Sequence, residues 1–140
     1  MSLDRFLKAH QDKYSQALLE IKKGSKKSHW IWFIFPQLKG LGKSYTSQYY
    51  GLDGLQETKK YFENPILQEH LLEISQALFE LNTDISQIVG YPDDLKIKSC
   101  MTLFEYTNPE YPIFSQILDK FYNGERDTIT LDILKNEKSM

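Results

Sequence analysis

The stretch SHWIWFIFPQ, residues 28–37, decides the fold of this sequence. Its aromatic and β-branched content alone would favour a strand. Nearly every other segment, however, has apolar residues at the spacing of a helix, and an isolated buried strand would leave its backbone donors and acceptors unpaired. We therefore predict a helix that is apolar on every side, begins after a cap at Ser28 and ends before Pro36. A helix of this kind belongs at the centre of an all-α fold.

The segments around this stretch also carry helical signals. Residues 3–21 form one apolar stripe, and Gly24 is placed to end that helix. Asn64 and Pro65 are typical of a cap and a first helical residue, and a second stripe follows over residues 66–81. Shorter helical units are predicted after Ser44, Asp53, Asp84, Pro92, Asn108 and Asp127. We predict one domain over residues 1–140, a compact orthogonal helical bundle in which a buried central helix is surrounded by about five others.

Composition and charge exclude several classes of protein. The chain has 140 residues, of which 41% are apolar and 14% aromatic, so it can bury a core and is not of the disordered type. Seventeen basic and nineteen acidic residues give a formal charge of −2, which offers no general attraction to nucleic acid or to anionic lipid. The basic cluster at residues 22–27 is typical of a solvated helix end. We predict neither a nucleic-acid partner nor a membrane partner.

Cysteine, histidine and apolar runs restrict the chemistry and the location. The single cysteine, Cys100, excludes an intrachain disulfide. No two of the histidines stand three to five residues apart, so we predict no metal site and no cofactor. The N-terminus lacks the apolar core of a secretion signal, and the longest apolar run, residues 30–35, is far shorter than the roughly twenty residues of a membrane-spanning helix. These features indicate a cytoplasmic protein of undetermined oligomeric state.

Two groups of polar residues are candidates for a functional site. The first comprises His29, Trp30, Trp32 and Gln37, and the second comprises Asp93, Asp94, Lys96, Lys98 and Ser99. An imidazole suits proton transfer near neutrality and indole faces suit stacking on flat ligands. Packing is the alternative in both cases: a core histidine held by a backbone carbonyl beside bulky indoles, and small hydroxyls that permit close helix contacts. A third candidate, Asp127, is fully explained as the cap of the last helix.

Three blocks of sequence resemble a known family. SHWIWFIFPQLKGLGKS (28–44), PDDLKIKSCMTLF (92–104) and LDKFYNGERDTITL (118–131) are similar to the signature blocks of DUF1810, a bacterial family of unknown function. The resemblance runs in order from about residue 3 to residue 134. It implies a compact all-α fold and no established activity. Its pattern includes Ser44 at the end of the first block, whereas His10, Lys98 and Cys100 depart from it, which leaves a role for those three in doubt.

Two further associations bear on function. Some members of the family carry the label calpastatin, an inhibitor of calpain. Inhibition of that type relies on disordered segments that fold on the protease, and this composition argues against it. A shorter resemblance, which includes residues 118–134, links the chain to the NADAR families, which are associated with ADP-ribose and NAD derivatives.

Two hypotheses follow. The first is a pocket for a small nucleotide-like ligand, such as ADP-ribose or an NAD derivative, lined by His29, Trp32, Gln37, Ser44, Asp94, Lys96 and Ser99. If the protein is an enzyme, we expect hydrolysis or transfer at a glycosidic carbon, with His29 as acid, Asp94 as base or electrostatic stabiliser, and Lys96 on a phosphate. The alternative is a non-enzymatic interaction module in which these residues serve packing. Its predicted contact surface consists of the exposed aromatic residues Tyr45, Tyr49 and Tyr50. The sequence leaves open whether there is a reaction.

Overall fold

The computed structural model describes residues 3–139, with side chains to residue 137, and this part of the chain is all-α with nine helices and no strand. The longer helices are α1 (Asp4–Lys22), α4 (Gly54–Glu63), α5 (Pro65–Phe79), α7 (Asp93–Thr107), α8 (Ile113–Phe121) and α9 (Thr128–Ser139). The short helices are α2 (Ile31–Ile34), α3 (Tyr45–Tyr50) and α6 (Ile85–Val89). The predicted all-α fold class is confirmed, and the longer helices match one central helix with about five others.

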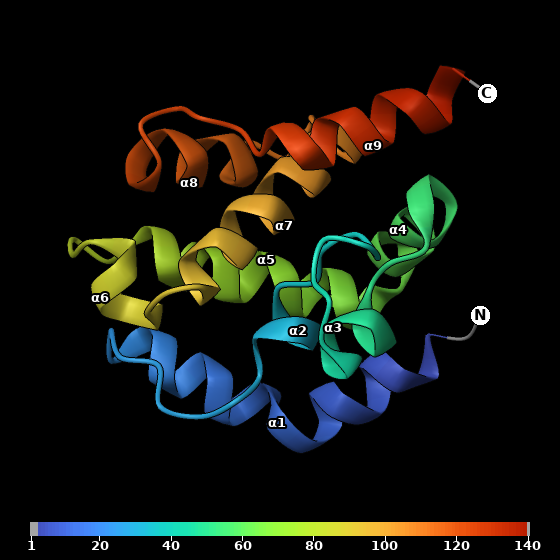
Figure 1. Cartoon of the computed structure of the whole chain (residues 1–140). Helices are drawn as coiled ribbons and strands as arrows, with labels where there is room; N and C mark the ends of the chain where they lie inside the picture. Colours follow the sequence, from blue (N-terminus) through green and yellow to red (C-terminus); the bar gives the residue numbers. More distant parts are fainter. Residues whose placement is uncertain (1–2, 140) are drawn as a thin grey trace.

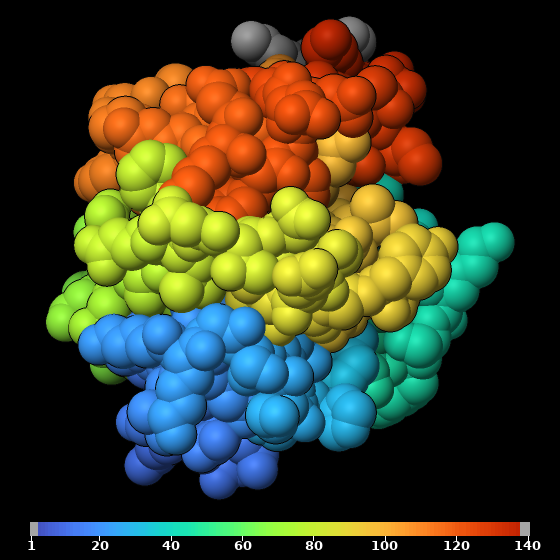
Figure 2. Space-filling model, turned by 90° about the vertical axis from the view of Figure 1, so that its left-hand side faces the viewer, coloured from blue at the N-terminus to red at the C-terminus, as the bar shows by residue number. Residues whose placement is uncertain are grey.

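The helices lie in three levels (Figure 1). α8 and α9 form one outer level, α1 lies at the opposite side with α2 and α3 against it, and α4 to α7 lie between. α5 contacts both α1 and α8, and α7 contacts both α8 and α9, so the middle level joins the two outer ones. Figure 2 shows the same order from the side, with α8 above the α5–α6 segment and that segment above α1.

The most enclosed helix is α7. Its buried residues include every position from Ser99 to Phe104, so several faces of the helix are covered at once. This burial on all sides is what we predicted for the segment 28–37. Residues 30–35 are also buried, apart from half-buried Trp32, but the helix there spans only Ile31–Ile34. The long, fully enclosed helix that we predicted for residues 28–35 is therefore α7.

Glu20 explains why the segment 28–37 contains so little helix. Its carboxylate, near the end of α1, accepts hydrogen bonds from the backbone N–H groups of Lys27 (2.7 Å) and Ser28 (3.0 Å), and from the indole N–H of Trp30 (2.9 Å). The Ser28 hydroxyl also donates to Glu20 instead of capping a helix, which corrects the predicted cap. The chain is therefore held on α1 up to Trp30, and only the single turn Ile31–Ile34 is helical.

The segment after residue 37 makes one short backbone pairing instead of a strand. Leu38 and Leu52 form an isolated parallel bridge, with hydrogen bonds from the Leu52 N–H to the Gln37 carbonyl and from the Lys39 N–H to the Leu52 carbonyl, both 2.9 Å. The bridge closes the loop that carries α3. It also fixes residues 37–42 beside the first turns of α7, where the candidate site lies.

Several predicted helix ends are confirmed by their capping bonds. Asn64 Oδ1 accepts from the backbone N–H groups of Ile66 and Leu67, and Pro65 follows the cap directly. Asp127 Oδ2 accepts from the Thr130 N–H at 2.9 Å.

Within residues 3–139, none of the helices has the length and apolar content needed to cross a bilayer.

Candidate functional site

Most of the predicted ligand-binding residues lie at two adjoining hollows. The outer hollow, of about 220 Å³, lies between residues 37–42, the start of α7 and the start of α9. Its polar lining is Gln37, Lys96, Ser99 and Asp127, and its apolar lining includes Leu41, Leu95 and Ile129. The structure therefore brings together Gln37, Lys96 and Ser99, which the sequence placed on two separate segments.

The inner crevice lies beside the outer hollow and is much tighter. Its walls include Trp32, Phe35, Ser47, Tyr50 and Gly51, and these described residues leave no space that a water molecule could occupy. Gln37 and Lys96 line both the inner crevice and the outer hollow. These two side chains are therefore the partition between an aromatic interior and a polar surface.

The polar groups of the outer hollow differ in how much hydrogen-bonding capacity they have left. Ser99 donates to the Leu95 carbonyl at 3.2 Å, and the Asp127 carboxylate is engaged by Thr130. In the described part of the chain, by contrast, the side-chain amide of Gln37 has no hydrogen-bond partner. The Lys96 ammonium lies 3.7 Å from the nearest carboxylate oxygen, which is an ion pair without a close hydrogen bond. Gln37 and Lys96 are thus the groups best able to take a ligand.

The carboxylate that faces Lys96 belongs to Asp93, which the sequence analysis named as a candidate but left out of the predicted pocket. Asp93 Oδ1 is the oxygen 3.7 Å from the Lys96 ammonium, and Asp93 Oδ2 accepts from Lys26 Nζ at 2.9 Å. Lys26 in turn lies over the Trp30 ring, 5.1 Å from its centroid. The spacing of residues 93, 96 and 99 by threes was the available signal, because side chains three apart share a helix face.

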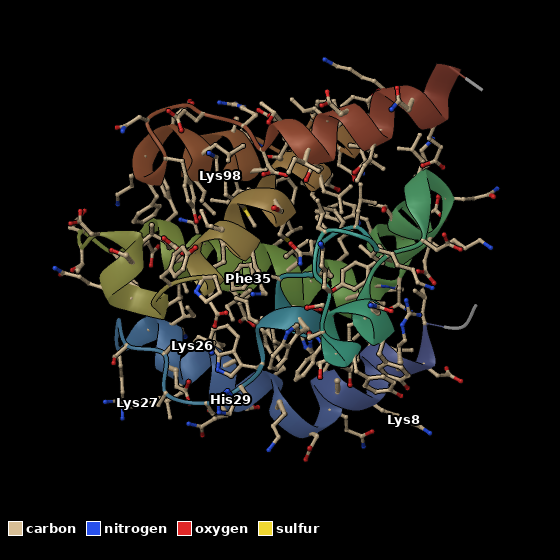
Figure 3. All side chains as sticks on the ribbon, viewed as in Figure 1. Lys8, Lys26, Lys27, His29, Phe35 and Lys98 are labelled. Carbon is tan, nitrogen blue, oxygen red and sulfur yellow. The ribbon has the colours of Figure 1, made fainter. Side chains whose placement is uncertain are left out.

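His29 and Asp94, the predicted acid and base, lie at neither hollow in the described structure. His29 is exposed, with its ring centroid 6.5 Å from that of Trp32, and Figure 3 places it on the α1 side of the molecule. The Asp94 carboxylate accepts from the adjacent Leu95 N–H at 2.9 Å, and its carbonyl accepts from the Tyr122 hydroxyl at 2.6 Å. The structure therefore does not join these residues in one site.

Ser44, the remaining predicted ligand-binding residue, has a structural partner. Its hydroxyl oxygen accepts from the Ser47 N–H at 3.1 Å and caps α3, and its hydroxyl donates to Ser47 Oγ at 3.0 Å. Ser44 does not line either hollow in the described structure, whereas Ser47 lines the inner crevice. Ser44 therefore contacts the site only indirectly, by its hydrogen bonds to Ser47.

A larger hollow, of about 420 Å³, lies elsewhere, between the α5–α6 connection and the end of α8. Its lining includes Asn82, Asp84, Lys120 and Asn123, and none of the predicted site residues. Among the residues that the structure describes, no group of three histidine, cysteine or acidic side chains is arranged to hold a metal ion. The candidate site therefore remains the pair of hollows that share Gln37 and Lys96.

These features define a small all-α protein with a polar hollow where a loop meets the first turns of two helices. The chain belongs to the family described as protein of unknown function (DUF1810), whose model matches residues 1–134. The predicted family is confirmed. The crystal structure of the conserved hypothetical protein Rv1873 from Mycobacterium tuberculosis is similar, with 36% identity over 95% of this chain and 96% of that chain and a TM-score of 0.93. The comparison with curated proteins gave no match.

Proposed function

We propose that the protein binds a small nucleotide-like ligand, such as ADP-ribose or an NAD derivative, with a ribose-phosphate part in the outer hollow. The observation that carries the proposal is the presence of the Lys96 ammonium, the unpartnered Gln37 amide and the Asp127 carboxylate at one hollow. An ammonium binds phosphate by a charge-assisted hydrogen bond. A carboxylate accepts from ribose hydroxyls, and an amide offers both donors and an acceptor.

The size of the hollow restricts the mode of binding. Pockets that enclose drug-sized ligands usually measure roughly 300–1,000 Å³. The outer hollow, at about 220 Å³, is smaller, so it holds one half of a dinucleotide while the other half stays in solvent. Because His29 and Asp94 lie away from it, we propose binding alone and assign no reaction at a glycosidic carbon.

Calorimetry with AMP, ADP-ribose and NAD tests the proposal, and two lysines of α7 provide a matched comparison. Lys96 and Lys98 side chains are equally exposed, at 20% each, but Lys98 pairs with Glu125 at 3.3 Å and lines neither hollow in the described structure. We expect Lys96→Ala to weaken binding at least tenfold and Lys98→Ala to leave it unchanged. A ligand at a hundred times its Kd should also stabilise the protein by about 2.7 kcal/mol. Absence of binding by all three ligands, or equal losses in the two variants, overturns the proposal.

A second candidate function, a protein-interaction module, is favoured by the surface of α3. Tyr45 and Tyr49 are 81% and 47% exposed, and their rings stack with centroids 6.1 Å apart. Tyr50, the third residue of the predicted patch, is half-buried and lines the inner crevice. The double variant Tyr45→Ser/Tyr49→Ser should abolish binding to a partner identified by crosslinking and then purified. If the double variant binds that partner with wild-type affinity, α3 is not the contact surface.

A cytoplasmic location is part of the proposal. It is supported by the cysteine content, because the single cysteine, Cys100, has no partner for an intrachain disulfide. Cell fractionation tests it directly, and recovery of the protein outside the cytoplasmic fraction would contradict it.

A further inference from the structure

We propose that the inner crevice is the closed form of a slot for a flat heterocyclic ring, with the side chains of Gln37 and Lys96 as its lid. The inference rests on the proposed function, because it assigns the base of the nucleotide-like ligand to this slot. The remainder of the ligand would then lie in the outer hollow, which shares Gln37 and Lys96 with the slot.

The two aromatic walls of the slot are held very differently. The Tyr50 ring packs against the rings of Tyr49, Phe33 and Phe6, with centroid distances of 4.8, 5.1 and 5.9 Å. Trp32 is half-buried, and among the described residues its ring contact is with the exposed His29 at 6.5 Å. Tyr50 is therefore a fixed wall, and Trp32 is a wall that can move.

The gap between these walls favours insertion of a ring. The crevice is too narrow for water, so the atoms that line it lack contact partners across the gap. A flat π-system between Trp32 and Tyr50 would supply those contacts, and stacking on aromatic side chains tolerates any base because every base has a π-face. The wall chemistry thus selects a planar aromatic ligand over a bulky aliphatic one.

Opening has to come from side chains, namely the lid and the movable wall Trp32, because the backbone around the slot is tightly packed. A Cβ placed on Gly51 would lie 2.6 Å from Lys39 Cα, and one placed on Gly42 would lie 2.5 Å from Ser47 Cβ. Gln37 and Lys96, in contrast, are long side chains without a close hydrogen bond in the described structure. Rotation of both side chains joins the crevice to the outer hollow without breaking a strong bond.

Ser47 supplies a polar contact inside the slot. It is buried and lines the crevice, and its Oγ accepts a hydrogen bond from the Ser44 hydroxyl at 3.0 Å. A hydroxyl that already accepts still has its own O–H to donate. The ring that fits best therefore carries an acceptor at its edge, such as a ring nitrogen or carbonyl of a purine.

The two tryptophans allow a direct test by fluorescence. Trp30 is fully buried and bonded to Glu20, whereas Trp32 lines the slot. Adenosine and AMP should change the emission of the wild type and leave that of Trp32→Phe unchanged. Ribose 5-phosphate should bind, by calorimetry, at least tenfold more weakly than AMP and without a change in emission. Unchanged emission with saturating AMP, or equal affinities for AMP and ribose 5-phosphate, overturns the slot.

The same three probes separate the slot from the proposed function. If ribose 5-phosphate binds and adenosine does not, the slot is refuted and the outer hollow stands. If adenosine changes the Trp32 emission and the phosphate adds no affinity, the slot stands and the phosphate assignment of the outer hollow is refuted. If none of the probes binds, both are refuted.

The lid can be tested without any ligand. Gln37→Ala should increase the quenching of Trp32 fluorescence by acrylamide, because it removes half of the lid and leaves the Leu38–Leu52 bridge intact. Gln87→Ala, at an exposed position of α6, is the control and should leave quenching unchanged. Equal quenching in the wild type and in Gln37→Ala would show that Gln37 is not a lid.

Discussion

The Nδ1 atoms of His10 and His70 lie 2.9 Å apart where α1 packs on α5. His10 Nε2 is 2.7 Å from the Phe33 carbonyl, which can only accept, so Nε2 carries the proton of the neutral ring. The neutral His10 then has a bare Nδ1, and His70 donates to it. Burial lowers the pKa of His10 to about 4, with His70 adding to the effect, and burial also lowers the pKa of His70.

We predict from this pair that the free energy of unfolding falls as the pH is lowered from 7 to 5. The pKa of His10 is about 4 in the folded state and about 6.5 in an unfolded chain, so the unfolded state binds more protons between these values. The stability is therefore complete above about pH 6.5 and is lost as the pH falls toward 4. Between pH 7 and pH 5 the loss from His10 alone is about 2 kcal/mol, measurable by urea denaturation.

Two glutamine variants serve as controls for this pH dependence. His10→Gln can still donate to the Phe33 carbonyl but does not titrate, so its stability should change much less between pH 7 and pH 5. His29→Gln alters an exposed histidine and should follow the wild-type curve. A His10→Gln curve as steep as that of the wild type would show that the pair is not responsible.

Removing Glu20 should destabilise the protein by about 3 kcal/mol or more. Its buried carboxylate accepts from two backbone N–H groups, from the Ser28 hydroxyl and from the fully buried Trp30 indole, and Glu20→Ala leaves all of these donors without this partner. Denaturation followed by near-ultraviolet circular dichroism reports both the stability and the environment of Trp30. Glu110→Ala, at an exposed position, should change the stability by about 0.5 kcal/mol or less. A similar cost for both variants would contradict this role of Glu20.

The contact of Glu20 with Ser28 shows the limit of predicting helix ends from sequence. Signals confined to a few neighbouring residues were reliable: the stripe of α1, the Asn64–Pro65 start of α5 and the Asp127 cap of α9 all appear in the structure. Ser28 looked like a cap by the same local rule. Its partner, however, is Glu20 on the preceding helix, and a propensity for capping carries no information about that contact.

In the candidate site, too, local sequence was informative about individual residues and not about the packing of distant segments. Lys96 and Ser99 were both predicted to line a pocket, and the structure puts both at the outer hollow. The choice of Asp94 over Asp93 failed to identify the carboxylate beside Lys96, because the rotation of α7 is fixed by its packing partners and not by its own sequence. The contact between residues 10 and 70 depends on how α1 and α5 pair in space and could not be predicted.

Arg5 and Glu57 form a buried ion pair whose disruption should cost about 3–5 kcal/mol. Arg5 donates to both carboxylate oxygens of Glu57, at 2.9 and 3.2 Å, and also to the carbonyls of Tyr49 and Gly51. Glu57→Gln removes the Glu57 charge from beside the buried guanidinium. Glu125→Gln instead removes an exposed partner of Lys98 and should lower the free energy of unfolding by less than about 1 kcal/mol. Urea denaturation measures both. Equal losses in the free energy of unfolding for Glu57→Gln and Glu125→Gln would show that burial does not make the Arg5–Glu57 pair more important than the Lys98–Glu125 pair.

Gly42 should be intolerant of even one methyl group, although its backbone conformation does not require glycine. A Cβ at this position would lie 2.5 Å from both Cβ and Oγ of Ser47, in the wall between the two hollows. We expect Gly42→Ala to destabilise the protein by about 1–3 kcal/mol through overpacking, as measured by urea denaturation. Ser47→Gly removes the clashing side chain, so the cost of Gly42→Ala should be smaller in a Ser47→Gly background than in the wild type. Strictly additive costs in this double-mutant cycle would mean that the two residues are not in contact, since coupling is expected only between neighbours.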